Sequence, residues 1–277
     1  MIVIDKQTRG RHGNKVFHFN TLMQLSSILE QESYTDLWDG YNSFIETCPT
    51  YLKREDTREI DHRDLVYNNI GELKSKYSKG NWNLHSLSLC GPYFRITKKD
   101  PRNFLKLKQT FLDDVQKTCV GIHIRGGDTR GADGMNCREI HEAKYYIDAI
   151  DFVVSEYGPE ETVFFLCTDD PDPNFSSYRD TMKYILSKKL NLYHDPSNHY
   201  IKDFSILSEC DIVIAGSSTF ALASGIMGKE KKMIHSKDFV EQFKEGDQTW
   251  YSNFCNGMFF YDLNHIKSDY YNLWKLI

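Results

Sequence analysis

The stretch that decides the fold spans residues 119–128 and reads CVGIHIRGGD. Its first six residues are mostly apolar and β-branched, which predicts a short strand over 119–124. The strand runs directly into an arginine, two glycines and an aspartate. Because side chains on a strand repeat every two residues, His123 and Arg125 are expected to point to the same face.

Strands and helices alternate on the C-terminal side of this stretch. The apolar patterns predict helices at about 141–157, 176–189, 201–209 and 220–228, and strands at 162–167, 191–194, 211–215 and 232–235. Such alternation indicates a parallel, doubly wound sheet. Ligands bind these sheets beyond the carboxyl ends of the strands. The polar clusters at 125–133, 168–172 and 216–219 all fall at such ends.

The N-terminal half is harder to order. Residues 1–5 are expected to form a short strand, 7–14 a turn, and 15–31 a helix with a broad apolar face. Residues 33–100 are polar, aromatic and weakly periodic, so short helices and strands are expected there in no definite order. A helix at about 101–117 is expected to lead into the second half.

Composition narrows the class of protein. The chain has 277 residues, 40% hydrophobic and 26% charged, with a formal net charge of −5. The length fits one large domain or two ordinary ones. The charge argues against bulk nucleic-acid binding and against a polybasic membrane anchor, and no apolar run is long enough for a membrane span. We therefore expect a soluble protein. The seven cysteines are odd in number and show no zinc spacing, and three of them lie in or beside apolar runs, so we expect a reducing, cytoplasmic compartment.

The polar cluster after the strand at 119–124 suits an anion. The guanidinium of Arg125 fits a phosphate or diphosphate, and Gly126 and Gly127 let the backbone approach a ligand. Asp128 would orient Arg125 or cap the next turn. The alternative is an ordinary strand end that carries an Arg–Asp pair.

Two further clusters also allow more than one interpretation. Residues 216–219, Gly-Ser-Ser-Thr, open a predicted helix, where they would bind an anion or simply cap the helix. Residues 168–170, Thr-Asp-Asp, would position a ribose or sugar hydroxyl, hold a metal through Asp170 and Asp172, or form a solvated loop. In the N-terminal turn, Arg11 opposes the dipole of the helix that follows, a conflict that is more frequent at functional sites; the alternative is an ordinary loop.

These clusters occur in an order that resembles the fucosyltransferase superfamily, which includes the α-1,2-, α-1,6- and protein O-fucosyltransferases. Residues 10–17, GRHGNKVF, are similar to its segment G-R-x-G-N-Q-x-F, and residues 123–128 to its motif H-x-R-R-x-D. Residues 145–170 resemble its helix and its strand that ends in S/T-D-D. Residues 203–220 resemble its last motif, D-x-x-x-L-S-x-C followed by S-S/T-F. No resemblance extends over 33–100 or beyond about 230.

The resemblance implies an α/β fold of the GT-B type, in which two Rossmann-like halves have parallel sheets that face each other across a cleft. Residues 1–115 would form the N-terminal, acceptor-side half. Residues 116–277 would form the C-terminal half that binds a nucleotide sugar, with a final helix that packs back on the first half. The implied activity is inverting transfer of a sugar, usually fucose from GDP-fucose, to a hydroxyl of a carbohydrate or glycan acceptor. No cofactor and no metal site are expected.

The resemblance also implies roles for single residues. Arg125 would grip the diphosphate, and Arg11 would enter the cleft from the other half. Asp133, ten positions after the motif histidine, corresponds to the catalytic base of the α-1,6 branch. The residues that would bind the donor are His123, Asp128, Asp169, Ser217, Ser218 and Thr219, with Gly13 and Asn14 from the other half.

The chain departs from the family at two places. Gly126 stands where the motif H-x-R-R-x-D has its second arginine, and losing one charge partner at a buried diphosphate typically costs about 2–5 kcal/mol. Residues 221–223, Ala-Leu-Ala, stand where many α-1,2 members have tryptophan. Either another base such as Arg130 or Arg11 compensates, or the donor differs, for example UDP-xylose or another GDP-sugar. Two alternatives stay open: a metal-dependent GT-A site at Asp170 and Asp172, and a non-catalytic protein that binds nucleotide sugars or glycans.

Overall fold

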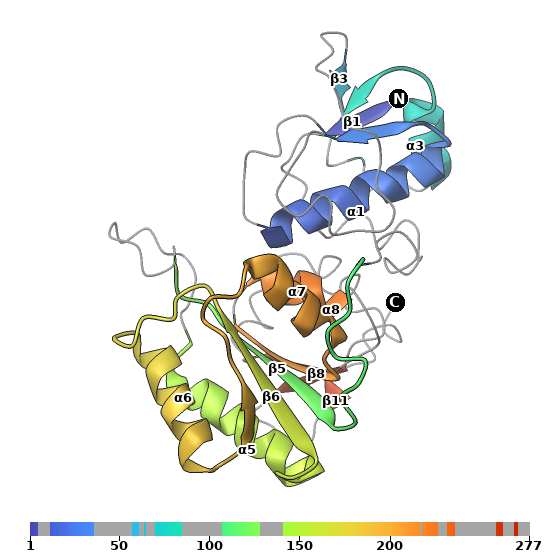
Figure 1. Ribbon diagram of the computed structural model, residues 1–277. Coiled ribbons are helices and arrows are strands. Elements are labelled where there is room, and N and C mark those ends of the chain that lie inside the picture. Colours follow the sequence, from blue (N-terminus) through green and yellow to red (C-terminus); the bar gives the residue numbers. More distant parts are fainter. Residues whose placement is uncertain are drawn as a thin grey trace. The chain divides into compact units, whose positions relative to one another are not determined.

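The computed structural model describes residues 1–4, 12–35, 57–60, 64, 70–84, 107–127, 141–216, 218–226, 232–235, 259–262 and 269–270. The chain divides into two compact units (Figure 1). The first comprises Met1–Lys108 and Phe243–Asn256, and the second comprises Gln109–Gln242 and Gly257–Ile277. Each unit contains its own sheet, in which most of the strands are parallel.

The second unit is built on a seven-stranded sheet in the order β11-β10-β9-β8-β5-β6-β7. The central strand β5 (Thr118–Ile124) pairs in parallel with β6 (Thr162–Thr168) on one side and with β8 (Ile212–Ala215) on the other. The remaining parallel strands are β7 (Asn191–Tyr193), β9 (Lys232–His235) and β10 (Phe259–Asp262). The edge strand β11 (Asp269–Tyr270) runs antiparallel to β10.

The helices of this unit form two pairs. They are α5 (Ala143–Tyr157), α6 (Ser176–Ser187), α7 (Tyr200–Glu209) and α8 (Thr219–Ile226). α5 packs with α6 and α7 packs with α8, and Figure 1 shows the two pairs on opposite faces of the sheet. The chain moves from β5 outward to β6 and β7, and then returns to β8 on the other side of β5. The strand order therefore reverses between β5 and β8, which is the switch point where doubly wound sheets bind ligands.

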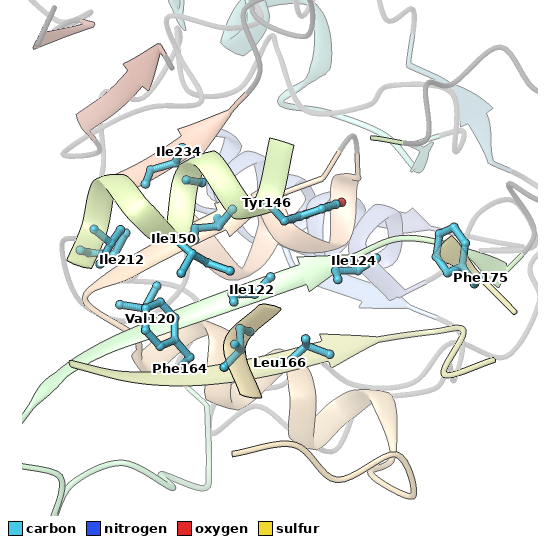
Figure 2. Close-up of a cluster of buried hydrophobic side chains, with 14 residues drawn as sticks. Val120, Ile122, Ile124, Tyr146, Ile150, Phe164, Leu166, Phe175, Ile212 and Ile234 are labelled. Atoms are coloured by element: carbon cyan, nitrogen blue, oxygen red, sulfur yellow. The ribbon is translucent and has the colours of Figure 1, made fainter. Parts of the chain in front are cut away.

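The two faces of β5 are packed differently. Val120, Ile122 and Ile124 are buried in a hydrophobic cluster with side chains of α5, β6 and β8 (Figure 2). On the other face, a Cβ added to Gly121 would lie 2.6 Å from Leu207 Cδ2, so α7 approaches the strand at a distance that only glycine allows. Because side chains alternate along a strand, His123 and Arg125 share the Gly121 face.

The first unit contains a four-stranded parallel sheet in the order β2-β1-β4-β3. Its strands are short: β1 (Ile2–Ile4), β2 (Ser33–Thr35), β3 (Arg58–Glu59) and β4 (Trp82–Asn83). The long helix α1 (His12–Leu29) packs against β1 and against α3 (Ile70–Tyr77). Hydrogen bonds from Ile2 N to Glu32 O and from Trp82 N to Met1 O continue the pairing beyond the strand ends.

The strands and helices predicted for residues 118–235 are confirmed, with bounds that differ by two residues or fewer. The helix α1 is also confirmed, although it begins at His12 and so takes in the last three residues of the predicted turn. The helix predicted over 101–117 is wrong for 107–117, where the structure has no helix. The backbone N–H groups of Phe111 and Leu112 instead donate to Glu209 Oε2 of α7, each at 2.7 Å.

The part of the chain beyond β9 contributes β10 and β11, which the sequence pattern did not predict. The final helix that was expected to pack back on the first half lies outside the described residues. None of the helices described for the chain combines the length and the apolar character that a bilayer span requires.

Candidate functional site

The candidate site lies where β5 and β8 end. Arg125 follows β5, and its Nη1 atom donates a hydrogen bond to Ser218 Oγ, which follows β8, at 3.1 Å. Ser218 Oγ also accepts from Phe220 N at 3.1 Å, so this buried serine caps the first turn of α8. A guanidinium at a helix N-terminus opposes the helix dipole, whereas an anion there would be favoured by both.

His123 is a buried, uncharged side chain on the same face of β5 as this arginine. Its side chain is 4% exposed and stacks on Phe220, with ring centroids 5.2 Å apart and an interplanar angle of 29°. Burial lowers the pKa of His123 to about 4; Arg125 adds to this effect and Asp169 opposes it. The imidazole is therefore neutral at pH 7. Its Nδ1 is buried and has no hydrogen-bond partner among the described residues.

Asp169 links the loops that follow β5 and β6. Its Oδ1 accepts a hydrogen bond from Gly126 N at 2.8 Å, while the carboxylate itself is exposed. The next residue, Asp170, is buried, and its N–H donates to Thr168 Oγ1 at 3.1 Å. Asp169 thus connects the loops that follow β5 and β6 through a hydrogen bond. Its contact with a nucleoside stays a prediction.

Gly126 sits in a space that admits no side chain. A Cβ built on it would lie 2.5 Å from Asp170 Cβ, 2.8 Å from Asp170 Oδ2 and 2.8 Å from Phe175 Cε1. Contacts this short force neighbouring atoms to move. The second arginine of the family motif is therefore absent, and Asp170 and Phe175 occupy the direction in which its side chain would leave the backbone.

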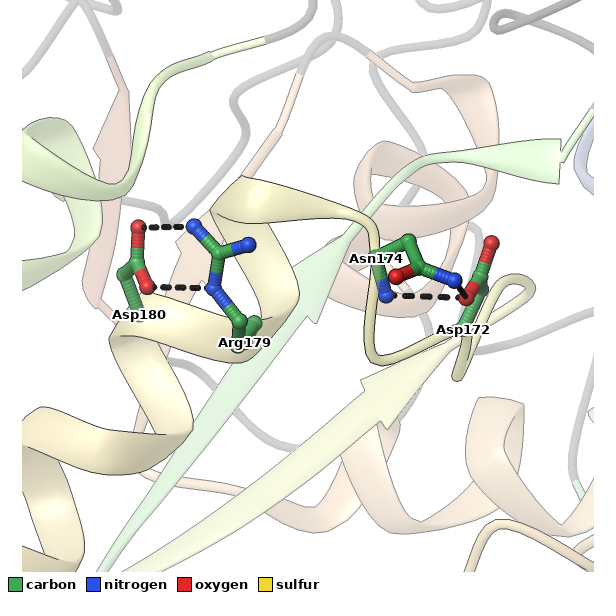
Figure 3. A network of polar contacts seen from close by, with 4 residues as sticks. All are labelled: Asp172, Asn174, Arg179 and Asp180. Atoms are coloured by element: carbon green, nitrogen blue, oxygen red, sulfur yellow. Dashed lines mark hydrogen bonds and ion pairs between the residues drawn. The ribbon is translucent and has the colours of Figure 1, made fainter.

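The carboxylates proposed for a metal are used in a turn. Asp172 N donates to Asp170 Oδ1 at 3.4 Å, and Asp172 Oδ1 accepts from Asn174 N at 2.8 Å and from Asn174 Nδ2 at 3.0 Å (Figure 3). These bonds shape the segment that leads into α6, where Arg179 pairs with Asp180. Within the described ranges, no group of three or more His, Cys, Asp and Glu side chains is arranged to hold a metal ion.

The other predicted site residues are placed only in part. Gly13 and Asn14 lie in the first turn of α1 in the first unit, and Gly13 is buried. Thr219 is the first residue of α8. The predicted residues that lie outside the described part of the chain are Arg11, Asp128, Asp133 and Ser217, together with Arg130.

Two buried polar residues near these loops were not predicted as site residues. Tyr146 of α5 is 1% exposed, and a Cβ added to Gly216 would lie 2.8 Å from its hydroxyl oxygen. Asp203 of α7 is 8% exposed and accepts from Asn198 Nδ2 at 3.1 Å. Burial raises the pKa of Asp203 to about 6. The signal for Asp203 was its place as the first residue of the segment that resembles the motif D-x-x-x-L-S-x-C. Tyr146 lies in the segment 145–170 that resembles the family, but nothing there marks it as a site residue.

Comparison with known proteins identifies the fold. No family model and no curated protein matches the chain. Among solved structures, it is similar to the protein O-fucosyltransferase POFUT1 in complex with GDP-fucose, with 10% identity, a TM-score of 0.54, and coverage of 83% of this chain and 95% of that one. POFUT1 in complex with GDP gives 11% identity, a TM-score of 0.53 and the same coverage of 83% and 95%.

At this level of identity the likeness concerns the fold. The chain is an α/β protein with two parallel-strand units of the GT-B type, as fucosyltransferases are, and the predicted fold class is confirmed. The resemblance inferred from the motifs is confirmed to the same extent. The GT-A alternative does not fit this architecture.

Proposed function

We propose that the chain is a glycosyltransferase that binds a nucleoside-diphosphate sugar at the switch point between β5 and β8. The observation that carries the proposal is the 3.1 Å contact of Arg125 Nη1 with Ser218 Oγ at the start of α8. It joins a permanent positive charge to a helix end that favours anions. GDP-fucose is the favoured donor, because solved structures of the same fold contain GDP-fucose and GDP.

The proposed reaction is an inverting displacement. The acceptor hydroxyl oxygen bonds to the anomeric carbon as the bond from that carbon to the diphosphate breaks, and the hydroxyl proton passes to a base. Negative charge grows on the leaving diphosphate, where Arg125 and the positive, N-terminal end of the α8 dipole would stabilise it without reorganising. His123, being neutral, contributes hydrogen bonding and packing rather than charge.

Other roles in this proposal rest on the motif resemblance alone. Asp133 is the proposed base, and it would contribute about 10²–10⁴-fold to the rate. Arg11 and Asn14 are proposed to reach the donor from the first unit, and the acceptor is proposed to be a carbohydrate or glycan. Ser217, Thr219 and Asp128 complete the proposed donor site.

The test measures nucleotide binding and turnover in the same variants. Calorimetric titration with GDP, UDP, GDP-fucose, GDP-mannose and UDP-xylose, each with and without EDTA, is expected to show GDP-selective binding that EDTA leaves intact. Arg125→Ala is expected to weaken GDP binding by roughly 30-fold or more, because truncating one partner of a buried charge pair costs about 2–5 kcal/mol. It should also abolish GDP release from GDP-fucose with a panel of glycan acceptors.

Arg179→Ala is the matched control, because Arg179 pairs with Asp180 on α6 and not with the site (Figure 3). It should bind GDP as the unmodified protein does. Near-normal turnover in Arg125→Ala would overturn the assignment. UDP-selective binding would keep the site and change the donor.

A non-catalytic nucleotide-sugar or glycan-binding protein is the second candidate. The filled space at Gly126 favours it, because the site then has one arginine where the family motif has two. Binding of GDP-fucose with no release of GDP in the presence of any acceptor would support this candidate over the transferase.

A further inference from the structure

The backbone N–H groups of Arg125 and Gly126 donate hydrogen bonds to side chains within the protein. Gly126 N donates to Asp169 Oδ1 at 2.8 Å. The backbone of Arg125 forms a hydrogen bond with the hydroxyl of Tyr146, which reaches the site from α5. Figure 2 shows the Tyr146 side chain lying along β5 with its hydroxyl directed toward the carboxyl end of the strand.

The surroundings of Gly216 locate the Tyr146 hydroxyl. A Cβ built on Gly216 would lie 2.8 Å from the Tyr146 oxygen, 3.1 Å from His123 O and 3.7 Å from Arg125 N. Gly216 N donates to His123 O at 3.1 Å. The hydroxyl therefore lies at the junction between the ends of β5 and β8. Burial raises the pKa of Tyr146, Asp169 raises it further, and a hydrogen bond from the Arg125 backbone opposes the rise.

We propose that Tyr146 and Asp169 are positioning residues: they hold the backbone of Arg125 and Gly126 and thereby place the Arg125 guanidinium against Ser218. This inference rests on the proposed nucleotide site. With its N–H groups held in this way, the 125–126 backbone does not cradle the diphosphate. Phosphate recognition then falls to the Arg125 side chain and the start of α8. That arrangement makes the site unusually dependent on how one arginine is held.

Asp169 is tested by a pair of variants. Asp169→Asn keeps an oxygen that accepts from Gly126 N, whereas Asp169→Ala removes it; the side chain is exposed, so neither change leaves a cavity. We expect Asn to keep GDP affinity within about threefold and Ala to lower it by roughly five- to tenfold, the effect of one lost hydrogen bond. A carboxylate that acted only through its charge would respond equally to both substitutions, and that outcome would overturn its positioning role.

Tyr146 is tested by Tyr146→Phe, which keeps the ring in the core. The expected result is a loss of GDP affinity of roughly fivefold. Tyr157→Phe is the matched control, because it removes a hydroxyl from the same helix, where Tyr157 accepts from Lys232 Nζ at 2.6 Å at the opposite end of the strands. Gly216→Ala should lower GDP affinity in the protein that keeps Tyr146, and it should lower the affinity less when it is combined with Tyr146→Phe. If the free-energy effects of Gly216→Ala and Tyr146→Phe on GDP binding simply added in the double variant, the placement of the hydroxyl would be overturned.

Amide exchange separates this inference from the proposed function. In the free protein, the amides of Arg125 and Gly126 should exchange roughly tenfold faster in Tyr146→Phe and Asp169→Ala respectively, and at the normal rate in Asp169→Asn and Tyr157→Phe. These rates need no nucleotide. Absence of GDP binding by the unmodified protein would count against the proposed function, whereas unchanged exchange in both variants would overturn the positioning role whatever the protein binds.

Discussion

Gly126 is the residue at which this chain differs most clearly from the motif it resembles. The sequence shows that an arginine is missing, and the structure shows what replaces it: Asp170 and Phe175 fill the space beyond the glycine Cα. The loss is therefore built into the packing of the loops after β5 and β6. Any compensating charge has to come from elsewhere in the chain, because a side chain at residue 126 has no room.

We expect Gly126→Ala to lower the free energy of unfolding by about 1–3 kcal/mol, the usual cost of forcing atoms into a well-packed site. Chemical denaturation monitored by tryptophan fluorescence measures this change. Gly126→Arg should be less stable still and should bind GDP no more tightly than the unmodified protein does.

The matched variant adds the methyl group at residue 126 and removes the side chain that faces it. Gly126→Ala combined with Asp170→Gly removes the Cβ that lies 2.5 Å away, and it should recover part of the lost stability. An arginine at 126 that left stability unchanged and tightened GDP binding would show that the space is open.

Single residues also show how far the site could be predicted. Arg125 and Ser218 were predicted because each follows a strand, and the carboxyl ends of neighbouring parallel strands meet. The structure brings Arg125 and Ser218 into contact as that rule requires. His123 was predicted from the motif resemblance alone. The sequence could not predict that Asp169 accepts from Gly126 N or that the Tyr146 hydroxyl lies beside Gly216. Both contacts join elements that are far apart in the sequence.

At the scale of elements, α7 shows how a helix carries both packing and charge. It approaches β5 through Gly121, and Glu209 at its C-terminal end accepts from the backbone of residues 111 and 112. These two hydrogen bonds satisfy backbone N–H groups in the segment before β5, where the expected connecting helix is absent from residues 107–117. A local pattern cannot reveal that a distant carboxylate satisfies the backbone of the segment.

Asp203, in the first turn of α7, gives a prediction about pH. Its pKa is raised to about 6 in the folded protein, from an ordinary value of 3.8. The folded protein therefore favours the protonated carboxyl of Asp203, and the free energy of unfolding decreases as the pH rises from about 4 through 6. The difference between the folded and ordinary pKa values of Asp203 corresponds to a loss of about 3 kcal/mol in the free energy of unfolding at pH 7. We expect Asp203→Asn to be as stable as the unmodified protein near pH 4 and more stable at pH 7.

Urea denaturation at a series of pH values measures the difference between the two proteins. Asp148→Asn is the control, since Asp148 is an exposed carboxylate that pairs with Lys144. A stability difference for Asp203→Asn that shrinks as the pH rises would contradict the predicted direction.

At the scale of the whole molecule, the two units differ in how well the sequence predicts them. In the second unit, long apolar runs alternate with amphipathic helices, so both element type and order follow from periodicity. In the first unit, β3 and β4 have two residues each, too few to show any period. β10 and β11 were missed for a related reason: β10 takes its place from pairing with β9, and the two-residue edge strand β11 takes its place from pairing with β10, rather than from their own sequence patterns.

The division into two units leads to a prediction about the whole chain. The groups at the switch point between β5 and β8, namely His123, Arg125 and Ser218, all belong to the second unit. GDP at about 100 times its dissociation constant stabilises the folded state by about 2.7 kcal/mol. In hydrogen-exchange mass spectrometry, we therefore expect GDP to slow exchange at the carboxyl ends of β5 and β6 and at the start of α8. Exchange in β2, the control segment, should not change.

The same experiment tests the proposed contribution of the first unit. If Arg11 and Asn14 reach the sugar, GDP-fucose should slow exchange at the start of α1 beyond what GDP does, since the added protection would come from the fucose. Equal protection of α1 by both ligands would assign these residues to the nucleotide. Protection confined to the second unit with either ligand would remove them from the donor site, and the donor would then be held by the residues around Arg125 alone.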